Sequence, residues 1–320
     1  MTTFGDALYQ FGGVPVGVAA GVMLAGGKWF YCDPTNGSDS ADGLTPDTAK
    51  ATLLAAYNLT RNNRNDGVVF IGGATAYNPA AAFTWSNSYT HLIGATNGLF
   101  GMGQRARIVN AAANDLATLF TLSGNGCLVQ NIQFFDGKDS AADGACALIS
   151  GERNHLVNCF VAGMGDATAS GPATRAGSYG LKVSGAENQF SFCHVGIDTI
   201  NRTAANSELI VSGARNTFYK TRFECYSETA GKFLVKIDNA GGDLRWNEFW
   251  DCEFYNYTAN WATGITNAFS MPASGSTHDV ILRGKNYFHK GMTVADNVTH
   301  IYAADATPSV TFGIAVNPTT

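Results

Sequence analysis

A repeated pattern of apolar and polar positions runs along the chain from Cys127 to Val294. Each copy has eight residues, with an apolar residue at the third and eighth positions and a small or apolar residue at the sixth. The copies are CLVQNIQF, NHLVNCFV, NQFSFCHV, NTFYKTRF and NEFWDCEF, starting at residues 127, 154, 188, 216 and 247, and a weaker copy starts at residue 286. A repeat of this size that tolerates insertions is typical of a solenoid.

The order of the apolar positions indicates β-structure. Within each copy the apolar residues first fall on alternate positions and then shift out of that alternation. This predicts a strand, a bend and a second strand rather than a helix. A short apolar run ending in Ser-Gly precedes several copies, as in LFTLSG and CALISG. We therefore predict an all-β fold, a right-handed parallel β-helix whose coils hydrogen-bond to one another at ~4.8 Å spacing.

Two slots of the repeat predict internal ladders. The first slot suits a corner of the coil, because asparagine tolerates the left-handed backbone conformation and hydrogen-bonds locally. The sixth slot holds small side chains that we expect to point into the core. The first-slot residues are Cys127, Asn154, Asn188, Asn216 and Asn247, and the cysteines of the sixth slot are Cys159, Cys193 and Cys252.

The chain divides into three predicted segments. Residues 1–28 form a Gly-rich, nearly uncharged arm, which we expect to anchor the protein to a partner. Residues 29–73 hold a first strand and a short capping helix, and residues 74–320 form the β-helix, with loops inserted at 162–178 and 255–278. Loops on a rigid scaffold often carry contacts. The candidate partner-binding residues are Phe4, Leu8, Tyr9, Phe11, Val14, Val16 and Val18 in the arm, and Tyr257, Trp261 and Phe269 in the second loop.

Charge and cysteine usage narrow the classes of function. The net charge is −5 and no Lys/Arg-rich run occurs, which argues against nucleic acid as a partner. The arm is too short and too interrupted by glycine and proline to span a bilayer, so no membrane is expected. The seven cysteines form no CxxC pair and no histidine lies at zinc-finger spacing. We therefore expect buried, reduced thiols and neither a metal site nor a cofactor.

The run from Tyr31 to Gly73 carries a family pattern. It contains YCDPTNGSDSADGLTPDTAKATL, in which Thr45 and Pro46 are expected to open a helix that continues through AKATLLAAYNLTRNN, and it ends with the strand GVVFIGG. This run resembles the start of the pectate-lyase-like β-helix domains found in virion proteins of tailed bacteriophages. Together with the uncharged arm, the resemblance implies a structural virion protein that decorates or cements the phage capsid.

The capsid-decoration hypothesis predicts a partner, an oligomeric state and a location. The arm, residues 1–28, would bind the major capsid protein. A homo-oligomer is expected, and a trimer is favoured because capsid lattices offer threefold sites. The protein would lie on the capsid surface of the virion after assembly in the host cytoplasm.

An enzyme is the alternative, because phage β-helices often cleave polysaccharide and glycoside hydrolysis needs two carboxylates ~5 to 10 Å apart. In that case Asp136 and Asp198 are the candidate catalytic residues of a tailspike polysaccharide depolymerase, either a hydrolase or a lyase. Glu224 and His194 follow inward-facing residues and are expected to be solvated on the outer face. Because no acid–base cluster stands out, a non-enzyme is favoured. A non-catalytic glycan-binding adhesin that uses the aromatic loop is a third hypothesis.

Overall fold

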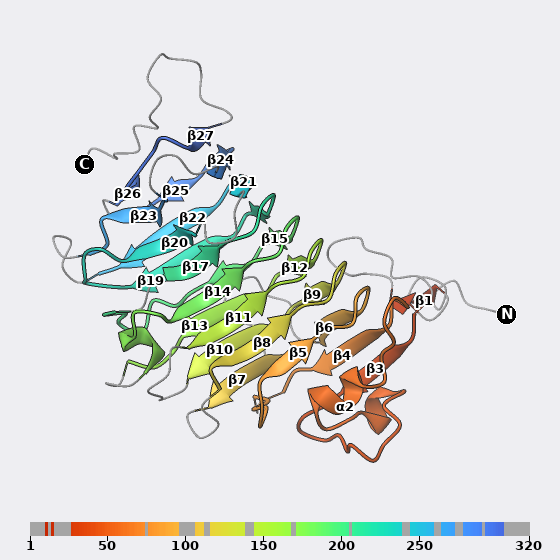
Figure 1. Cartoon of the computed structure of the whole chain (residues 1–320). Coiled ribbons are helices and arrows are strands. Elements are labelled where there is room, and N and C mark those ends of the chain that lie inside the picture. Colours follow the sequence, from red (N-terminus) through yellow and green to blue (C-terminus); the bar gives the residue numbers. More distant parts are fainter. Residues whose placement is uncertain are drawn as a thin grey trace.

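The computed structural model is a right-handed parallel β-helix, which confirms the predicted fold class. Figure 1 shows the coils stacked from the N-terminal end, in red, to the C-terminal end, in blue. The structure describes residues 27–73, 76–95, 106–111, 116–137, 144–167, 171–204, 207–238, 244–258, 264–272, 278–289 and 292–303, together with the backbone of residues 10–11 and 14–15.

Three parallel sheets form the walls of the described helix, in addition to the antiparallel hairpin of β1 (Gln10–Phe11) and β2 (Val14–Pro15). The ten-stranded sheet contains β3 (Trp29–Cys32), β4 (Gly67–Ile71), β6 (His91–Ala95), β9 (Leu128–Gln130), β12 (His155–Val157), β15 (Gln189–Ser191), β18 (Thr217–Tyr219), β21 (Leu244–Trp250), β24 (His278–Arg283) and β27 (Ile301–Ala303). The seven-stranded sheet contains β7 (Arg107–Ala111), β10 (Gln133–Gly137), β13 (Phe160–Met164), β16 (His194–Val195), β19 (Arg222–Tyr226), β22 (Glu253–Tyr257) and β25 (Tyr287–Phe288). The eight-stranded sheet contains β5 (Phe83–Trp85), β8 (Thr118–Leu122), β11 (Ala145–Ile149), β14 (Tyr179–Val183), β17 (Ser207–Val211), β20 (Phe233–Ile237), β23 (Asn267–Ser270) and β26 (Thr293–Ala295).

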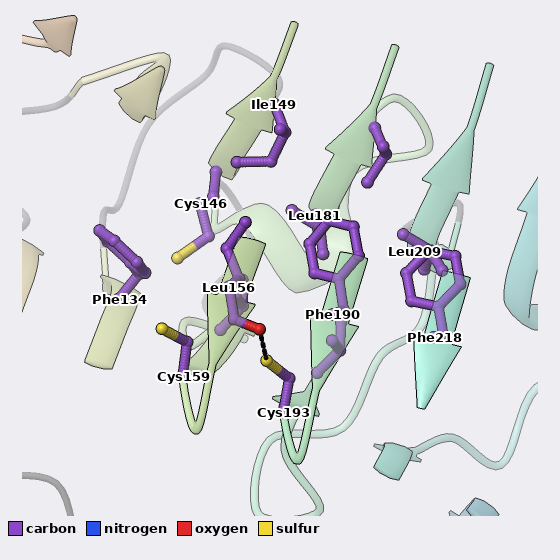
Figure 2. Close-up of a cluster of buried hydrophobic side chains, with 14 of the residues drawn as sticks. Phe134, Cys146, Ile149, Leu156, Cys159, Leu181, Phe190, Cys193, Leu209 and Phe218 are labelled. Carbon is purple, nitrogen blue, oxygen red and sulfur yellow. Dashed lines mark hydrogen bonds between the residues drawn. The ribbon is translucent and has the colours of Figure 1, made fainter. Parts of the chain in front are cut away.

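The core consists of equivalent side chains stacked from coil to coil. Parallel strands in register bring the same repeat position of successive coils together, so Phe190 lies opposite Phe218, and Phe218 lies opposite Phe249. Their rings stack with centroids 4.7 Å apart in each pair. Such aromatic pairs add about 0.5–1.5 kcal/mol each to the stabilisation from burial. Figure 2 shows Phe190 and Phe218 in this stack, facing Leu181 and Leu209 of the eight-stranded sheet.

The corner before the ten-stranded sheet carries the asparagine row. The Oδ1 of each asparagine accepts a hydrogen bond from the backbone N–H of the first-slot residue in the previous coil: Asn154 from Cys127 at 2.8 Å, Asn188 from Asn154 at 2.9 Å, Asn216 from Asn188 at 2.9 Å and Asn247 from Asn216 at 3.0 Å. The side chains thus satisfy buried donors that the tight corner removes from the strand ladders.

The Ser-Gly dipeptides belong to the same corner, where successive coils lie too close for a side chain. A Cβ at Gly185 would lie 1.9 Å from the carbonyl oxygen of Gly151, and one at Gly213 would lie 2.0 Å from that of Gly185. Only glycine fits such an approach.

The turn into the seven-stranded sheet carries the cysteine row. Each small side chain donates to a carbonyl of the previous coil, as Cys193 does to Leu156 at 3.4 Å (Figure 2). Thr221 occupies the same slot and its hydroxyl donates to Phe190 at 3.4 Å. The slot therefore favours a small residue with a polar hydrogen, although Ile132 fills it in the first copy. All seven cysteines are buried and free.

The N-terminal cap differs from its prediction. A continuous helix opened by Thr45 is wrong: a 3-10 turn, η1 (Pro46–Thr48), comes first, and α2 (Leu53–Tyr57) is a separate short helix. Between them the chain is extended, because Lys50 pairs with Cys32 at the end of β3. Thr52 then caps α2, whose buried face lies against β3 and β4 (Figure 1). None of the described helices has the length and apolar character needed to cross a bilayer.

The long connections follow the strands of the seven-stranded sheet. The insertion expected at 162–178 is shorter in the structure, because β13 continues to Met164, and the connection contains a second 3-10 turn, η2 (Pro172–Thr174). The insertion expected at 255–278 likewise begins inside β22 and includes the four residues of β23. The outer face of the seven-stranded sheet is therefore the face next to the variable segments.

Candidate functional site

Two adjoining pockets form a groove on the outer face of the seven-stranded sheet. They share Arg222 and Glu253. The groove crosses the coils of β16, β19, β22 and β25, a distance of about 14 Å at ~4.8 Å per coil. The acidic pocket, of about 350 Å³, is lined by Asp198, Arg222, Glu224, Glu253, Tyr255 and His289. The aromatic pocket, of about 410 Å³, is lined by Phe192, Lys220, Thr221, Arg222, Asp251, Glu253, Lys285 and Tyr287.

Strand register places these side chains in rows. One row of the seven-stranded sheet aligns His194, Arg222, Glu253 and Tyr287 on successive coils. The residue that follows each of them is buried in the core, as Phe223 and Phe254 are. Because successive side chains of a strand point to opposite faces, the row projects outward. Glu224 aligns with Tyr255 in the next outward row.

Three charged residues meet in the acidic pocket. The Nε of Arg222 lies 2.8 Å from Oε2 of Glu253, and its Nη1 lies 3.9 Å from Oε2 of Glu224. Because both distances end on one guanidinium, the two carboxylate oxygens lie at most about 9 Å apart, which is compatible with the separations of about 5 to 9.5 Å that glycoside cleavage uses. The pocket thus holds two carboxylates on adjacent coils with an arginine between them.

Burial separates the roles of the two carboxylates. The Glu253 side chain is 40% exposed, whereas that of Glu224 is 3% exposed. Oε1 of Glu224 lies 2.7 Å from Nε2 of His194, whose side chain is also buried. The His194 ring stacks on Phe160 with centroids 4.5 Å apart. Glu224 therefore has a histidine beside it and restricted access to water.

The segment 197–204 accounts for this burial. Ile197 and Ile200 pack with Phe160 on the outer side of the sheet, outside the main core. The segment is held by Arg202, which donates to Oε1 of Glu208 at 3.1 Å and to the carbonyl of Phe233 at 2.7 Å. Asp198, which lines the acidic pocket, lies on this anchored segment.

Glu208 is itself buried below the groove. Burial raises the pKa of its carboxyl to about 7, the positive charge of Arg202 opposes that rise, and the charge of Glu224 adds to it. The Glu208 carboxyl therefore lies within the electrostatic influence of Glu224. Shifted acids near a cleft are features of functional sites, although structural ion pairs produce them as well.

The predicted catalytic pair does not come together. Asp198 lines the acidic pocket, but Asp136 is fully buried on β10 and accepts a hydrogen bond of 2.8 Å from Nδ2 of Asn110. Strand β13 separates β10 from β16, the strand that precedes Asp198. Pairing Asp136 with Asp198 is therefore wrong.

Two further expectations need correction. Glu224 and His194 do point outward, but they are buried rather than solvated, because the 197–204 segment covers this part of the sheet. The functional candidates that the sequence analysis missed are Arg222 and Glu253, whereas Glu224 and His194 were considered but expected to be solvated. The sequence does show charged residues at outward positions of adjacent copies. It does not show which segment covers these positions in the folded protein.

The candidate partner-binding residues differ in burial and in whether the structure describes them. Phe269 lies on β23 and is fully buried in the core against Phe249 and Phe254, so its assignment to a contact surface is wrong. Tyr257 ends β22 and is 42% exposed. For Phe11 and Val14 only the backbone is described, in the β1–β2 hairpin. Phe4, Leu8, Tyr9, Val16, Val18 and Trp261 lie outside the described residues.

Within the described ranges, no group of three or more His, Cys, Asp or Glu side chains is arranged to hold a metal ion. The side chains of the groove include carboxylates and imidazole, which can transfer protons, and Arg222, which can pair with charge.

Comparison with known proteins places the fold but not the family. No protein-family model and no curated protein sequence matches the chain. Among solved structures, the pectin methylesterase PemA from Erwinia chrysanthemi is similar with a TM-score of 0.52 and 12% identity over 88% of this chain and 91% of that one. The pectin methylesterase from carrot has a TM-score of 0.55 and 8% identity, covering 87% and 88% of the two chains. The pectate lyase Pel9A has a TM-score of 0.51 and 13% identity, covering 88% and 78%. At these identities the similarity establishes the parallel β-helix alone.

Proposed function

We propose that this protein binds a polysaccharide along the groove on the seven-stranded sheet and hydrolyses it there. The observation that carries the proposal is the pair Glu224 and Glu253, held on adjacent coils by Arg222. Hydrolysis of a glycosidic bond requires two carboxyl groups that flank it, one to protonate the leaving oxygen and one to act as nucleophile or to activate water.

The environments assign the two roles. Glu224 is shielded from water and lies beside His194, so we assign it as the proton donor to the leaving oxygen. Glu253 is open to the groove and paired with the Arg222 guanidinium, so we assign it as the nucleophile or general base. Asp198, on the anchored segment, is placed to hydrogen-bond sugar hydroxyls.

The structural neighbours support a carbohydrate ligand by analogy. They are pectin methylesterases and a pectate lyase, and they share the parallel β-helix over most of their length. One fold hosts many functions, so the support from analogy is weaker than that from the groove.

The test is the release of oligosaccharide from a panel of bacterial capsular polysaccharides and lipopolysaccharides, measured by reducing ends and mass spectrometry. Loss of an acid–base group lowers the rate by about 10²–10⁴-fold, which is expected for both Glu224→Gln and Glu253→Gln. Glu248→Gln is the matched control, because Glu248 forms an equivalent 2.8 Å ion pair with Arg283 on a different sheet. Wild-type release that both groove variants retain, or no release from any polysaccharide, contradicts the proposal. Binding without release instead favours the glycan-binding adhesin.

A capsid-decoration role is a second proposal, motivated by the phage-like run from Tyr31 to Gly73. In this run the Asp33 carboxylate accepts hydrogen bonds from the backbone N–H groups of Thr35 and Asn36, so the motif residues build the first turn. In this role residues 1–28 bind the major capsid protein and the protein acts as a trimer on the capsid surface. Deletion of residues 2–28 is expected to abolish binding to purified capsids. Unchanged binding rules out the anchoring role.

A further inference from the structure

The aromatic pocket contains an unusual backbone position. In the turn between the ten-stranded and seven-stranded sheets, successive coils each place one residue at positive φ. These residues are Asn131 (56°), Asn158 (49°), Phe192 (56°), Lys220 (47°), Asp251 (53°) and Gly284 (64°). Glycine, asparagine and aspartate adopt this conformation readily, whereas a bulky phenylalanine or a lysine is strained there.

Both strained residues line the aromatic pocket. Strain that persists in a regular fold is a feature of ligand-binding positions, because the local sequence is then selected for something other than stability. In the other four coils this turn position is occupied by asparagine, aspartate or glycine, which adopt positive φ readily. The fold itself therefore does not require Phe192 or Lys220 there. Bulky residues at positive φ also occur at the corner before the ten-stranded sheet, as Arg215 and Trp246 do. The case for a ligand therefore rests on the pocket that the side chains of Phe192 and Lys220 line.

The rings of the pocket are open to a ligand. Phe192 is 42% exposed and Tyr287 is 52% exposed, and both line the same pocket of about 410 Å³. Exposed aromatic rings in a concave site provide flat apolar surfaces for a ring-shaped ligand.

The charged residues that line the pocket are three cations and two carboxylates, so its net charge is positive by one. Glu253 is paired with Arg222, and Oδ1 of Asp251 accepts a hydrogen bond of 2.7 Å from the backbone N–H of Lys285. The Nζ of Lys220 lies 5.9 Å from the centre of the Phe192 ring and 5.3 Å from that of Tyr219. The ion pairs found within the described part of the chain include neither Lys220 nor Lys285.

From this arrangement, and resting on the proposed function, we propose that the aromatic pocket is the subsite for a sugar residue that bears a negative charge. Lys220 and Lys285 pair with the anionic group, and the rings of Phe192 and Tyr287 contact the sugar. The adjoining acidic pocket then cleaves the chain next to that charged residue. The substrate class is an anionic polysaccharide.

The experiment compares an array of carboxylate-bearing bacterial polysaccharides with the same polysaccharides after chemical reduction of their carboxyl groups. Wild-type protein is expected to bind at least one acidic polysaccharide about tenfold more tightly than its reduced form, and added salt is expected to remove this preference because it screens exposed charges. The double variant Lys220→Gln/Lys285→Gln is expected to bind both forms equally. Lys236→Gln, on the eight-stranded sheet, is the matched control and is expected to keep the preference.

A second variant separates function from structure. Phe192→Asn places a residue suited to positive φ in the turn, so it is expected to raise the midpoint of chemical unfolding while weakening binding about tenfold. A stable variant with wild-type binding overturns the subsite, as does equal wild-type binding of acidic and reduced forms. Equal binding of both forms with continued cleavage leaves the proposed function intact, whereas no binding and no cleavage across the panel refutes both proposals.

Discussion

Replacing one asparagine in the middle of the corner row is expected to destabilise the whole solenoid. Asn216 is fully buried. Its Oδ1 accepts from the backbone N–H of Asn188 at 2.9 Å and from Nδ2 of Asn188 at 3.2 Å, and its own Nδ2 donates to Oδ1 of Asn247 at 3.2 Å. Asn216→Ala therefore removes three hydrogen bonds and leaves the buried backbone N–H of Asn188 without its acceptor.

The magnitude follows from these contacts. A net contribution of about 0.5–1.5 kcal/mol for each of the three hydrogen bonds, with a further penalty of about 1–3 kcal/mol for a buried donor left without an acceptor, gives a loss of about 2.5–7.5 kcal/mol. This is large against the total stability of a typical domain, about 5–15 kcal/mol.

Urea unfolding followed by far-ultraviolet circular dichroism measures the loss, as a lower midpoint at an unchanged slope. Asn58→Ala is the control, because Asn58 is an exposed residue at the end of α2, and it is expected to change the free energy of unfolding by less than about 0.5 kcal/mol. A loss below about 1 kcal/mol for Asn216→Ala means that the corner does not depend on this side chain, and refutes the reasoning.

Two further predictions concern buried polar groups. His91 accepts a hydrogen bond from the backbone N–H of Leu128 through Nδ1 at 3.0 Å, and burial lowers its pKa from 6.5 to about 4. The neutral ring thus stabilises the fold above pH 6.5, and about 3 kcal/mol is lost as the pH falls from 6.5 to 4; the urea midpoint of His91→Gln is expected to lack this part of the pH dependence. Cys252 donates to the carbonyl of Phe218 at 3.2 Å, and Thr221 fills the same slot one coil earlier, so Cys252→Thr is expected to cost under about 1.5 kcal/mol, whereas Cys252→Leu overpacks the row and costs about 1–3 kcal/mol. Equal urea midpoints for the two Cys252 variants contradict this.

The interior of the helix could be predicted because stacked coils repeat one environment. A row such as Asn188, Asn216 and Asn247 is visible in the sequence, since each position makes the same bond to its neighbour. The alternation of inward and outward side chains along a strand also predicts that Asp136 is buried. Asp136 lies two residues after the inward-facing Phe134 and so points inward itself. The assignment of Asp136 as a candidate catalytic carboxylate did not take this alternation into account.

The groove could be predicted only in part. Alternation places Glu224 and His194 on the outer face, but their burial depends on Arg202 anchoring the 197–204 segment to Glu208, a contact between a loop and the next strand. No local pattern encodes such a contact. Phe269 was assigned to a contact surface because the short strand β23 lies within a stretch whose sequence is typical of an inserted loop.

The contrast between the two faces of one strand bears on how this fold can acquire a function. The inward residues that follow the groove row are all apolar, as Phe254 and Phe288 are, because each packs on the coil above and below. The outward row changes chemical type at every coil, from imidazole to guanidinium to carboxylate to phenol. Backbone register fixes the spacing of both rows, so outward side chains can change without disturbing the core. A ligand site on this face therefore draws on positions that the fold leaves unconstrained, whereas Phe192 and Lys220 occupy turn positions where positive φ costs stability.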